Sequence, residues 1–270
     1  MAIYDCFQFF NEDHVLDLRL NILSEYVDFF VIVESTTDHQ GNPKKLNFEI
    51  EKFKRFKKKI IYTVVEDTVQ IIRKKHIGQN SLVERHQRNS IMKGLIKSND
   101  DDLVIISDVD EIPDLSKLNL FDKTKYAVFS QKKFDYKLNL LNETEGDWHG
   151  SKICLKKFLK SPQWLRDLKF KKYPSWRIDK IKNIQIIENG GWHFSYLQSP
   201  DKIIEKITSF SHGERNKPEF ANIQNIEEKI KNQQNIFDLG FDYKKVELDD
   251  TFPKYIIENK EKYKKWIIND

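Results

Sequence analysis

An acidic cluster follows a short apolar run near the middle of the chain and is the part of the sequence best suited to chemistry. Residues 103–106 are apolar, and Ser107 then leads into Asp108, Asp110 and Glu111. In an extended backbone, side chains two residues apart project to the same side, so the carboxylates of Asp108 and Asp110 can converge on one point. Acids this close repel one another unless a cation lies between them, and hard oxygen ligands favour Mg²⁺ or Mn²⁺. The spacing therefore indicates a divalent-metal site at the carboxyl end of a strand, where open α/β sheets bind their ligands.

Two classes of enzyme use such a pair of acids. In phosphatases of the haloacid dehalogenase type, the first acid is a nucleophile, which would be Asp108 here, and the motif usually lies near the start of the domain. In sugar-nucleotide glycosyltransferases, the acids hold a cation that stabilises a departing diphosphate. About a hundred residues precede Asp108, enough to build a nucleotide pocket first. The sequence favours the glycosyltransferase, with the phosphatase as the alternative.

A histidine late in the chain is a second candidate for the metal site. His193 follows Gly190 and Gly191, and two glycines would let the backbone approach a ligand closely. A neutral imidazole is a common metal ligand, so His193 is predicted to touch the metal or the diphosphate, with a core histidine as the alternative. His212 is the other candidate for this position.

Basic and aromatic side chains provide candidates for binding the rest of a donor. Arg88 precedes the acidic strand and could reach a nucleotide, although a structural ion pair would explain it equally well. Lys206 could neutralise a diphosphate, or it could be a solvated helix residue. Trp192 and Trp148 could offer an apolar face to a sugar ring, although tryptophans more often lie in the core.

Transfer to a hydroxyl group also requires a general base near the acceptor. Asp147 and Glu188 precede the two segments expected to border the acceptor, and Glu111 belongs to the acidic tip itself. The sequence leaves the choice among these three carboxylates open.

The pattern of apolar residues predicts the elements that position these side chains. Near-continuous apolar runs predict buried parallel strands, at residues 3–10, 27–33, 60–65 and 103–106. Helical spacing predicts a helix after Asn11 and another opened by a capping box from Ser81 to Glu84, with Ile96 on its apolar side. Alternation predicts one half-exposed antiparallel strand over residues 126–138. Further strands are expected at 152–155 and 184–187, and helices at 199–210, 222–237 and 254–268. The fold class is thus α/β: one domain with a mixed, mostly parallel central sheet flanked by helices and followed by C-terminal helices.

Composition excludes several other classes of protein. The 270 residues include 46 basic and 42 acidic side chains, a net charge of +4, which argues against a nucleic-acid partner. The longest apolar run, residues 29–33, is far shorter than the roughly 20 residues of a membrane span, and no leader precedes it. Two cysteines, Cys6 and Cys154, are too few for a disulfide framework or a structural zinc site. We therefore expect a cytoplasmic protein without a membrane span.

Five segments in this order resemble glycosyltransferase family 17, which includes β-1,4-mannosyl-glycoprotein 4-β-N-acetylglucosaminyltransferase. The segments are residues 4–12, 27–35, 87–89, 107–113 and 191–195. The resemblance implies a GT-A fold, a UDP-sugar donor (UDP-N-acetylglucosamine first), Mn²⁺ or Mg²⁺, a glycan or glycoconjugate acceptor, and inversion at the anomeric carbon. The non-enzymatic alternative is a module that binds a sugar or a nucleotide without catalysing a reaction.

The resemblance also assigns residues and regions. By position, Asp108 and Asp110 would be the metal-diphosphate acids, and Asn11, Glu12 and Glu34 would lie at the nucleotide edge. Within a single domain of residues 1–270, we expect a nucleotide-sugar-binding half (1–114), an acceptor half (115–215) and a C-terminal helical segment (216–270).

Overall fold

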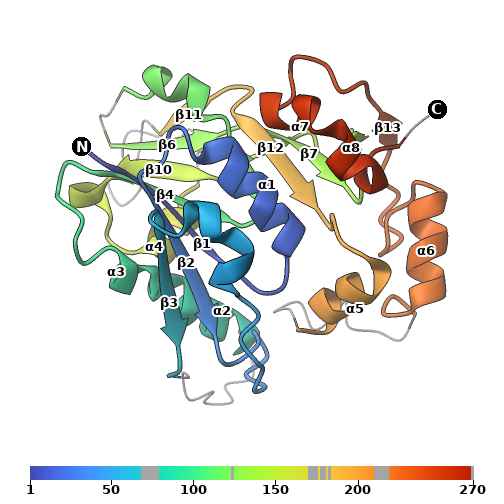
Figure 1. Ribbon diagram of the computed structural model, residues 1–270, viewed down its shortest axis with the longest axis horizontal. Coiled ribbons are helices and arrows are strands. Elements are labelled where there is room, and N and C mark those ends of the chain that lie inside the picture. Colours follow the sequence, from blue (N-terminus) through green and yellow to red (C-terminus); the bar gives the residue numbers. More distant parts are fainter. Residues whose placement is uncertain are drawn as a thin grey trace.

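A seven-strand mixed sheet forms the centre of the fold (Figure 1). The computed structural model describes residues 1–67, 79–122, 125–169, 176, 181, 184–209 and 219–268. In the order of the sheet, its strands are β11 (Gln185–Ile187), β6 (Tyr126–Phe129), β10 (Lys152–Leu155), β4 (Leu103–Asp108), β1 (Ile3–Gln8), β2 (Phe29–Ser35) and β3 (Ile60–Val65). Strands β4, β1, β2 and β3 are parallel, and β10 runs antiparallel to both β4 and β6. The predicted mixed, mostly parallel α/β sheet is confirmed.

Helices cover both faces of this sheet, which explains why its central strands are apolar along their whole length. Phe7, Phe30 and Ile105 pack with α1 (Asp13–Leu23) on one face. The alternate residues Cys6 and Val31 pack on the other face. That second face is covered by α2 (Gln79–Asn89), α3 (Ile91–Gly94) and α4 (Pro162–Asp167). Successive side chains of a strand point to opposite faces, so each face receives an apolar row.

The second predicted helix differs from the expectation at both ends. Ser81 lies inside α2, so the predicted capping box at Ser81 is wrong. The helix is interrupted at Ser90, before the short helix α3. Ile96, which lies beyond α3, is 81% exposed and does not pack against the sheet. Ile91 and Leu95 are buried against the sheet, whereas Ile96 lies beyond the end of α3 at Gly94 and faces solvent.

A smaller sheet packs beside the first. Its strands, in order, are β13 (Tyr243–Lys245), β8 (Leu140–Asn142), β7 (Gln131–Asp135), β12 (Gly191–Ser195) and β5 (Glu111–Pro113), and β9 (Asp147–Trp148) pairs with β7. The single strand predicted over residues 126–138 is wrong. It divides at Ser130 into β6 of the large sheet and β7 of the small one. All four residues of β6 are buried, because helices and neighbouring strands cover both of its faces.

Helices of the C-terminal part surround the smaller sheet in Figure 1. They are α5 (Pro200–Ser209), α6 (Ile223–Lys231), α7 (Lys254–Glu258) and α8 (Lys260–Tyr263). The helix expected over residues 222–237 ends at Lys231, and the one over 254–268 is divided into α7, α8 and a 3₁₀ turn at Lys264–Trp266. Short 3₁₀ helices also occur at Ile50–Phe56, Leu115–Leu120 and Lys156–Phe158. Among the described residues, no helix is long and apolar enough to cross a membrane.

Candidate active site

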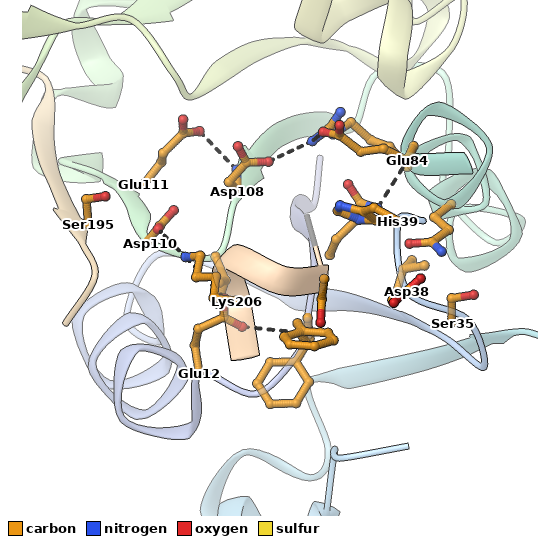
Figure 2. Close-up of a pocket in the computed structure, with 18 of the residues that line it drawn as sticks. Glu12, Ser35, Asp38, His39, Glu84, Asp108, Asp110, Glu111, Ser195 and Lys206 are labelled. Carbon is orange, nitrogen blue, oxygen red and sulfur yellow. Dashed lines mark hydrogen bonds and ion pairs between the residues drawn. The ribbon is translucent and has the colours of Figure 1, made fainter. Parts of the chain in front are cut away.

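A cavity of about 320 Å³ opens where the two sheets meet. Strand β4 ends at Asp108 and β5 begins at Glu111, so the acidic tip is the crossover between the sheets. Figure 2 shows Asp108, Asp110 and Glu111 together on one side of the cavity, with Lys206 and Glu12 beside them. The volume falls within the range of roughly 300–1,000 Å³ that is usual for small-molecule sites.

The backbone of the acidic tip is held by Arg19, a fully buried residue of α1. Its Nη1 donates to the carbonyl oxygens of Asp108 at 3.0 Å, Val109 at 3.2 Å and Glu111 at 2.6 Å. Its Nε and Nη2 donate to the buried carboxylate of Asp5 at 2.7 and 2.6 Å. One guanidinium therefore fixes three carbonyl groups of the backbone on which the acids are mounted.

Two arginines hold the carboxylate of Asp108. Arg88, at the end of α2, donates to Oδ1 at 2.9 Å, and Arg166 of α4 donates to Oδ2 at 2.7 Å. Burial alone would raise the pKa of Asp108, but the two guanidiniums outweigh it and lower that pKa to about 2. Helix α4 is positioned by Ser161, which caps it by accepting from the backbone N–H of Trp164.

Glu111 is enclosed by donors and braces the tip. Its Oε1 accepts from Trp148 Nε1 and from Arg166 Nη2, both at 2.6 Å. Its Oε2 accepts from the backbone N–H of Asp108 at 2.9 Å and from Arg166 Nη1 at 2.7 Å. A Cβ on Gly150 would lie 2.2 Å from this carboxylate, so only glycine fits there. With two hydrogen bonds on each oxygen, Glu111 has little capacity left to take a proton from an acceptor.

Asp110 has a different set of neighbours. Lys206 of α5 lies 3.1 Å from its Oδ2, and the same Nζ lies 3.3 Å from Glu12 Oε1. The other oxygen, Oδ1, lies 3.6 Å from His193 Nε2, beyond hydrogen-bonding distance. Burial would raise the pKa of Asp110, but the positive charge of Lys206 and the nearby imidazole lower it well below its usual range. Within the described chain, His193 Nδ1 is buried without a hydrogen-bond partner.

The structure brings together only part of the predicted set. Glu12, Arg88, Trp148, Lys206 and His193 line the cavity with the acidic tip. Asn11 does not line it, although its side chain bonds to Glu205 of α5 and to Gln198, which precedes that helix. His212 lies outside the described residues.

The other predicted residues lie away from the cavity wall. Glu34 is buried and accepts from Lys44 Nζ at 2.6 Å and from the backbone N–H groups of Asn47 and Phe48, so it anchors the loop after β2. Trp192 turns to the opposite side of β12, where its Nε1 donates to Thr251. The remaining two candidates for the base, Asp147 and Glu188, do not line the cavity either.

The two glycines before His193 serve the backbone rather than a ligand. A Cβ on Gly191 would lie 2.2 Å from the carbonyl oxygen of Ile112, and one on Gly190 would lie 2.6 Å from that of Ile187. The interpretation that they admit a ligand is therefore wrong. They let β12 approach β5 and the end of β6 closely enough to place His193 on the cavity wall.

Two residues that hold the acidic tip, Arg19 and Arg166, were not among the predicted site residues. Arg19 lies four residues after Val15 and three after Leu16, on the apolar side of α1, and a charged residue in that position is a usable signal of a buried ion pair. Lys206, which was a candidate, similarly shares the buried side of α5 with Ile203 and Ile207. Arg166 had no comparable signal.

Polar groups also line the opposite end of the cavity, beyond Arg88. Gln87 Nε2 donates to the carbonyl oxygen of Thr37 at 3.0 Å, and Asp38 Oδ1 accepts from two backbone N–H groups of its own turn. Burial lowers the pKa of His39, which lines this end. A neutral imidazole, an amide and a carboxylate there could recognise the hydrogen-bonding edge of a nucleobase.

The charges around the tip bear on whether a cation fits. Counted over the described residues, five carboxylates contact three basic side chains, which leaves two net negative charges: Glu12, Glu84, Asp108, Asp110 and Glu111 against Arg88, Arg166 and Lys206. Over the described ranges, no group of three or more acidic, histidine or cysteine side chains is arranged so that it could hold a metal ion by itself. A Mg²⁺-like ion needs only one or two carboxylates when substrate phosphates and water complete its shell. The residues therefore fit a cation that arrives with a diphosphate.

The sequence was also compared with known proteins. A family model described as Glycosyltransferase family 17 matches residues 1–268. No curated protein matches the sequence.

Proposed function

Since the chain belongs to glycosyltransferase family 17, we propose that it is a metal-dependent, inverting glycosyltransferase that uses a UDP-sugar. The transferred sugar is N-acetylglucosamine, and the acceptor is a hydroxyl group of a glycan or glycoconjugate. The observation that carries this proposal is the arginine- and lysine-braced pair Asp108 and Asp110 at the carboxyl edge of the parallel strands. That edge is where α/β sheets bind nucleotides.

The cavity supports a division of the donor between its two ends. The nucleoside would lie toward His39 and Gln87, the diphosphate beside Arg88 and Lys206, and the sugar toward Trp148. In the reaction, an acceptor oxygen forms a bond to the anomeric carbon while the bond from that carbon to the diphosphate oxygen breaks. The hydroxyl proton passes to a general base, and UDP leaves with the electron pair.

Basic side chains of the site would stabilise the negative charge that develops on the leaving diphosphate. Lys206 and Arg88 are buried cations that line the cavity, and charge interactions are stronger where water is excluded. Asp110, with Asp108 and His193 nearby, would hold Mn²⁺ or Mg²⁺, which supplies Lewis-acid stabilisation of the diphosphate when bound. The excess of two negative charges among the described side chains of the free site favours such a cation, because a diphosphate alone would be repelled.

The phosphatase alternative finds less support in this geometry. A nucleophilic Asp108 would need a carboxylate oxygen free to attack phosphorus. Both of its oxygens accept hydrogen bonds from guanidinium groups, which lowers their nucleophilicity.

Ligand-induced thermal stabilisation tests the proposed function directly. We expect UDP-N-acetylglucosamine with Mn²⁺ to stabilise the protein by about 2.7 kcal/mol when the donor is present at about 100 times its dissociation constant. Asp110→Asn should lose this stabilisation and the transfer activity. Asp101→Asn, the same change at an exposed position, should keep both. Full transfer by the Asp110→Asn variant, or no stabilisation by any UDP-sugar, would contradict the proposal.

A further inference from the structure

The ammonium group of Lys206 lies between two buried carboxylates, in a position that a metal cation could occupy. Its side chain is 8% exposed, and those of its partners Asp110 and Glu12 are 9% and 5% exposed. The face of Tyr196 lies 5.7 Å from the ammonium group. In Figure 2, Lys206 reaches from α5 toward Asp110, with Glu12 below it. The ammonium thus supplies the positive charge that the two acids need in the free protein.

Glu12 keeps its position without this lysine. Its Oε2 accepts from the backbone N–H groups of Phe10 at 3.2 Å and Asn11 at 3.0 Å. Asp110 is held through its backbone, because its carbonyl oxygen accepts from Phe194 N at 2.9 Å. If the ammonium moved away, both carboxylates would remain at the cavity wall.

Asp108 differs from Asp110 in being held by two guanidinium groups. Each of its oxygens is hydrogen-bonded to a guanidinium, from Arg88 or from Arg166, and these arginines are held in turn by Gln163 and Glu111. Releasing Asp108 would break two arginine contacts, whereas releasing Asp110 requires the movement of one flexible lysine.

We propose that Lys206 is a resident counter-ion of Asp110 and Glu12 that exchanges with a divalent cation, and that Asp108 positions the arginines instead of ligating the metal. This rests on the proposed function and concerns regulation of the same site. Without a nucleotide, Lys206 stays paired with Asp110 and keeps the affinity of the site for a metal ion low. When a diphosphate enters, Lys206 moves to its oxygens and Asp110 becomes available to the cation. Metal and donor would therefore bind cooperatively.

Titration of the free protein with Mn²⁺, followed by electron paramagnetic resonance of the unbound ion, tests this exchange without turnover. Lys206→Gln should bind Mn²⁺ about tenfold more tightly than wild type in the absence of nucleotide. Lys206→Met, which keeps the aliphatic stem, should do the same and serves if the Gln variant does not fold. Lys202→Gln, a change at an exposed lysine of the same helix, should bind as wild type does. Asp110→Asn should lose the saturable site, and Asp108→Asn should keep it.

The outcomes separate this inference from the proposed function. Unchanged or weaker Mn²⁺ binding by the folded Lys206 variants would overturn the exchange, and loss of the site in Asp108→Asn would overturn the role given to that aspartate. In either case, wild-type protein that binds UDP with Mn²⁺ would leave the proposed function standing. Wild-type protein that binds neither UDP nor Mn²⁺ would overturn both.

Discussion

Arg19 shows how one buried side chain can determine the geometry of a site that it does not line. It links Asp5 in the centre of the sheet to the three carbonyl groups of the acidic tip. A buried ion pair contributes little net stability compared with apolar residues of similar volume. Its value here is positional, because the tip has no helix or continuous ladder to hold it.

Replacing Arg19 with methionine should therefore destabilise the protein strongly. The change leaves the fully buried carboxylate of Asp5 without a partner, and breaking a buried pair in this way costs about 3–5 kcal/mol. Chemical denaturation monitored by circular dichroism measures the change in the free energy of unfolding. Arg55→Met, at an exposed arginine, should change it by less than about 0.5 kcal/mol.

A double variant separates stability from positioning. Arg19→Met with Asp5→Leu removes both charges, and we expect it to recover much of the lost stability. It should still bind UDP and Mn²⁺ more weakly than wild type, because the carbonyl groups of the tip remain unsupported. Wild-type affinity in a stable double variant would show that Arg19 acts on stability alone.

The residues of the site were predictable to different degrees. Asp108 and Asp110 could be singled out because an apolar strand must end at the edge of its sheet, and that edge is where ligands bind. The partners Arg88 and Lys206 could be named as candidates, but not paired with particular acids. Arg166 was not predictable, since it meets Asp108 only through the packing of α4 against the sheet, a contact between positions 58 apart in the chain.

At the scale of elements, buried parallel strands were the most predictable part, because burial on both faces leaves a continuous apolar run. The break between β6 and β7 was hidden, since Tyr126, Val128, Phe134 and Tyr136 keep one alternation across two sheets. Strand β12 was missed because its residues Gly191–Ser195 combine glycine, histidine and serine. Pairing with β5 and β7, which is a tertiary effect, makes it a strand.

Gly191 provides a test of how closely β12 and β5 must approach. Its φ is 137°, and a Cβ added there would lie only 2.2 Å from the Ile112 carbonyl oxygen, which leaves no room for alanine. Gly191→Ala should destabilise the protein by about 3 kcal/mol or more, because backbone atoms cannot move aside. Gly240, with φ of 65° and open space around it, is the matched control, and Gly240→Ala should cost about 1 kcal/mol. Equal losses in denaturation would mean that backbone strain, and not contact between the strands, explains both.

At the scale of the whole molecule, the site requires both sheets. Glu12 follows β1 of the large sheet, His193 belongs to β12 of the small one, and Asp110 lies on the crossover between them. Lys206 arrives on the helix that follows β12. A ligand that contacts all four should therefore stabilise the two sheets as one cooperative unit.

The two cysteines report whether the molecule opens as such a unit. Cys6 on β1 and Cys154 on β10 are fully buried in the large sheet. Burial raises the pKa of Cys154 to about 12 and that of Cys6 well above its usual value, so neither thiolate forms near neutral pH in the folded state. Labelling by a disulfide reagent at about pH 8, slightly below the ordinary thiol pKa, should therefore require opening of the sheet. Both cysteines should then react at the same rate. The variants Cys6→Ala and Cys154→Ala, which each keep one thiol, allow the two rates to be measured separately. UDP-sugar with Mn²⁺ at about 100 times its dissociation constant should slow both reactions about a hundredfold, because it binds only the closed form. Protection of one thiol alone would show that the sheet opens in parts and that the donor stabilises only one of them.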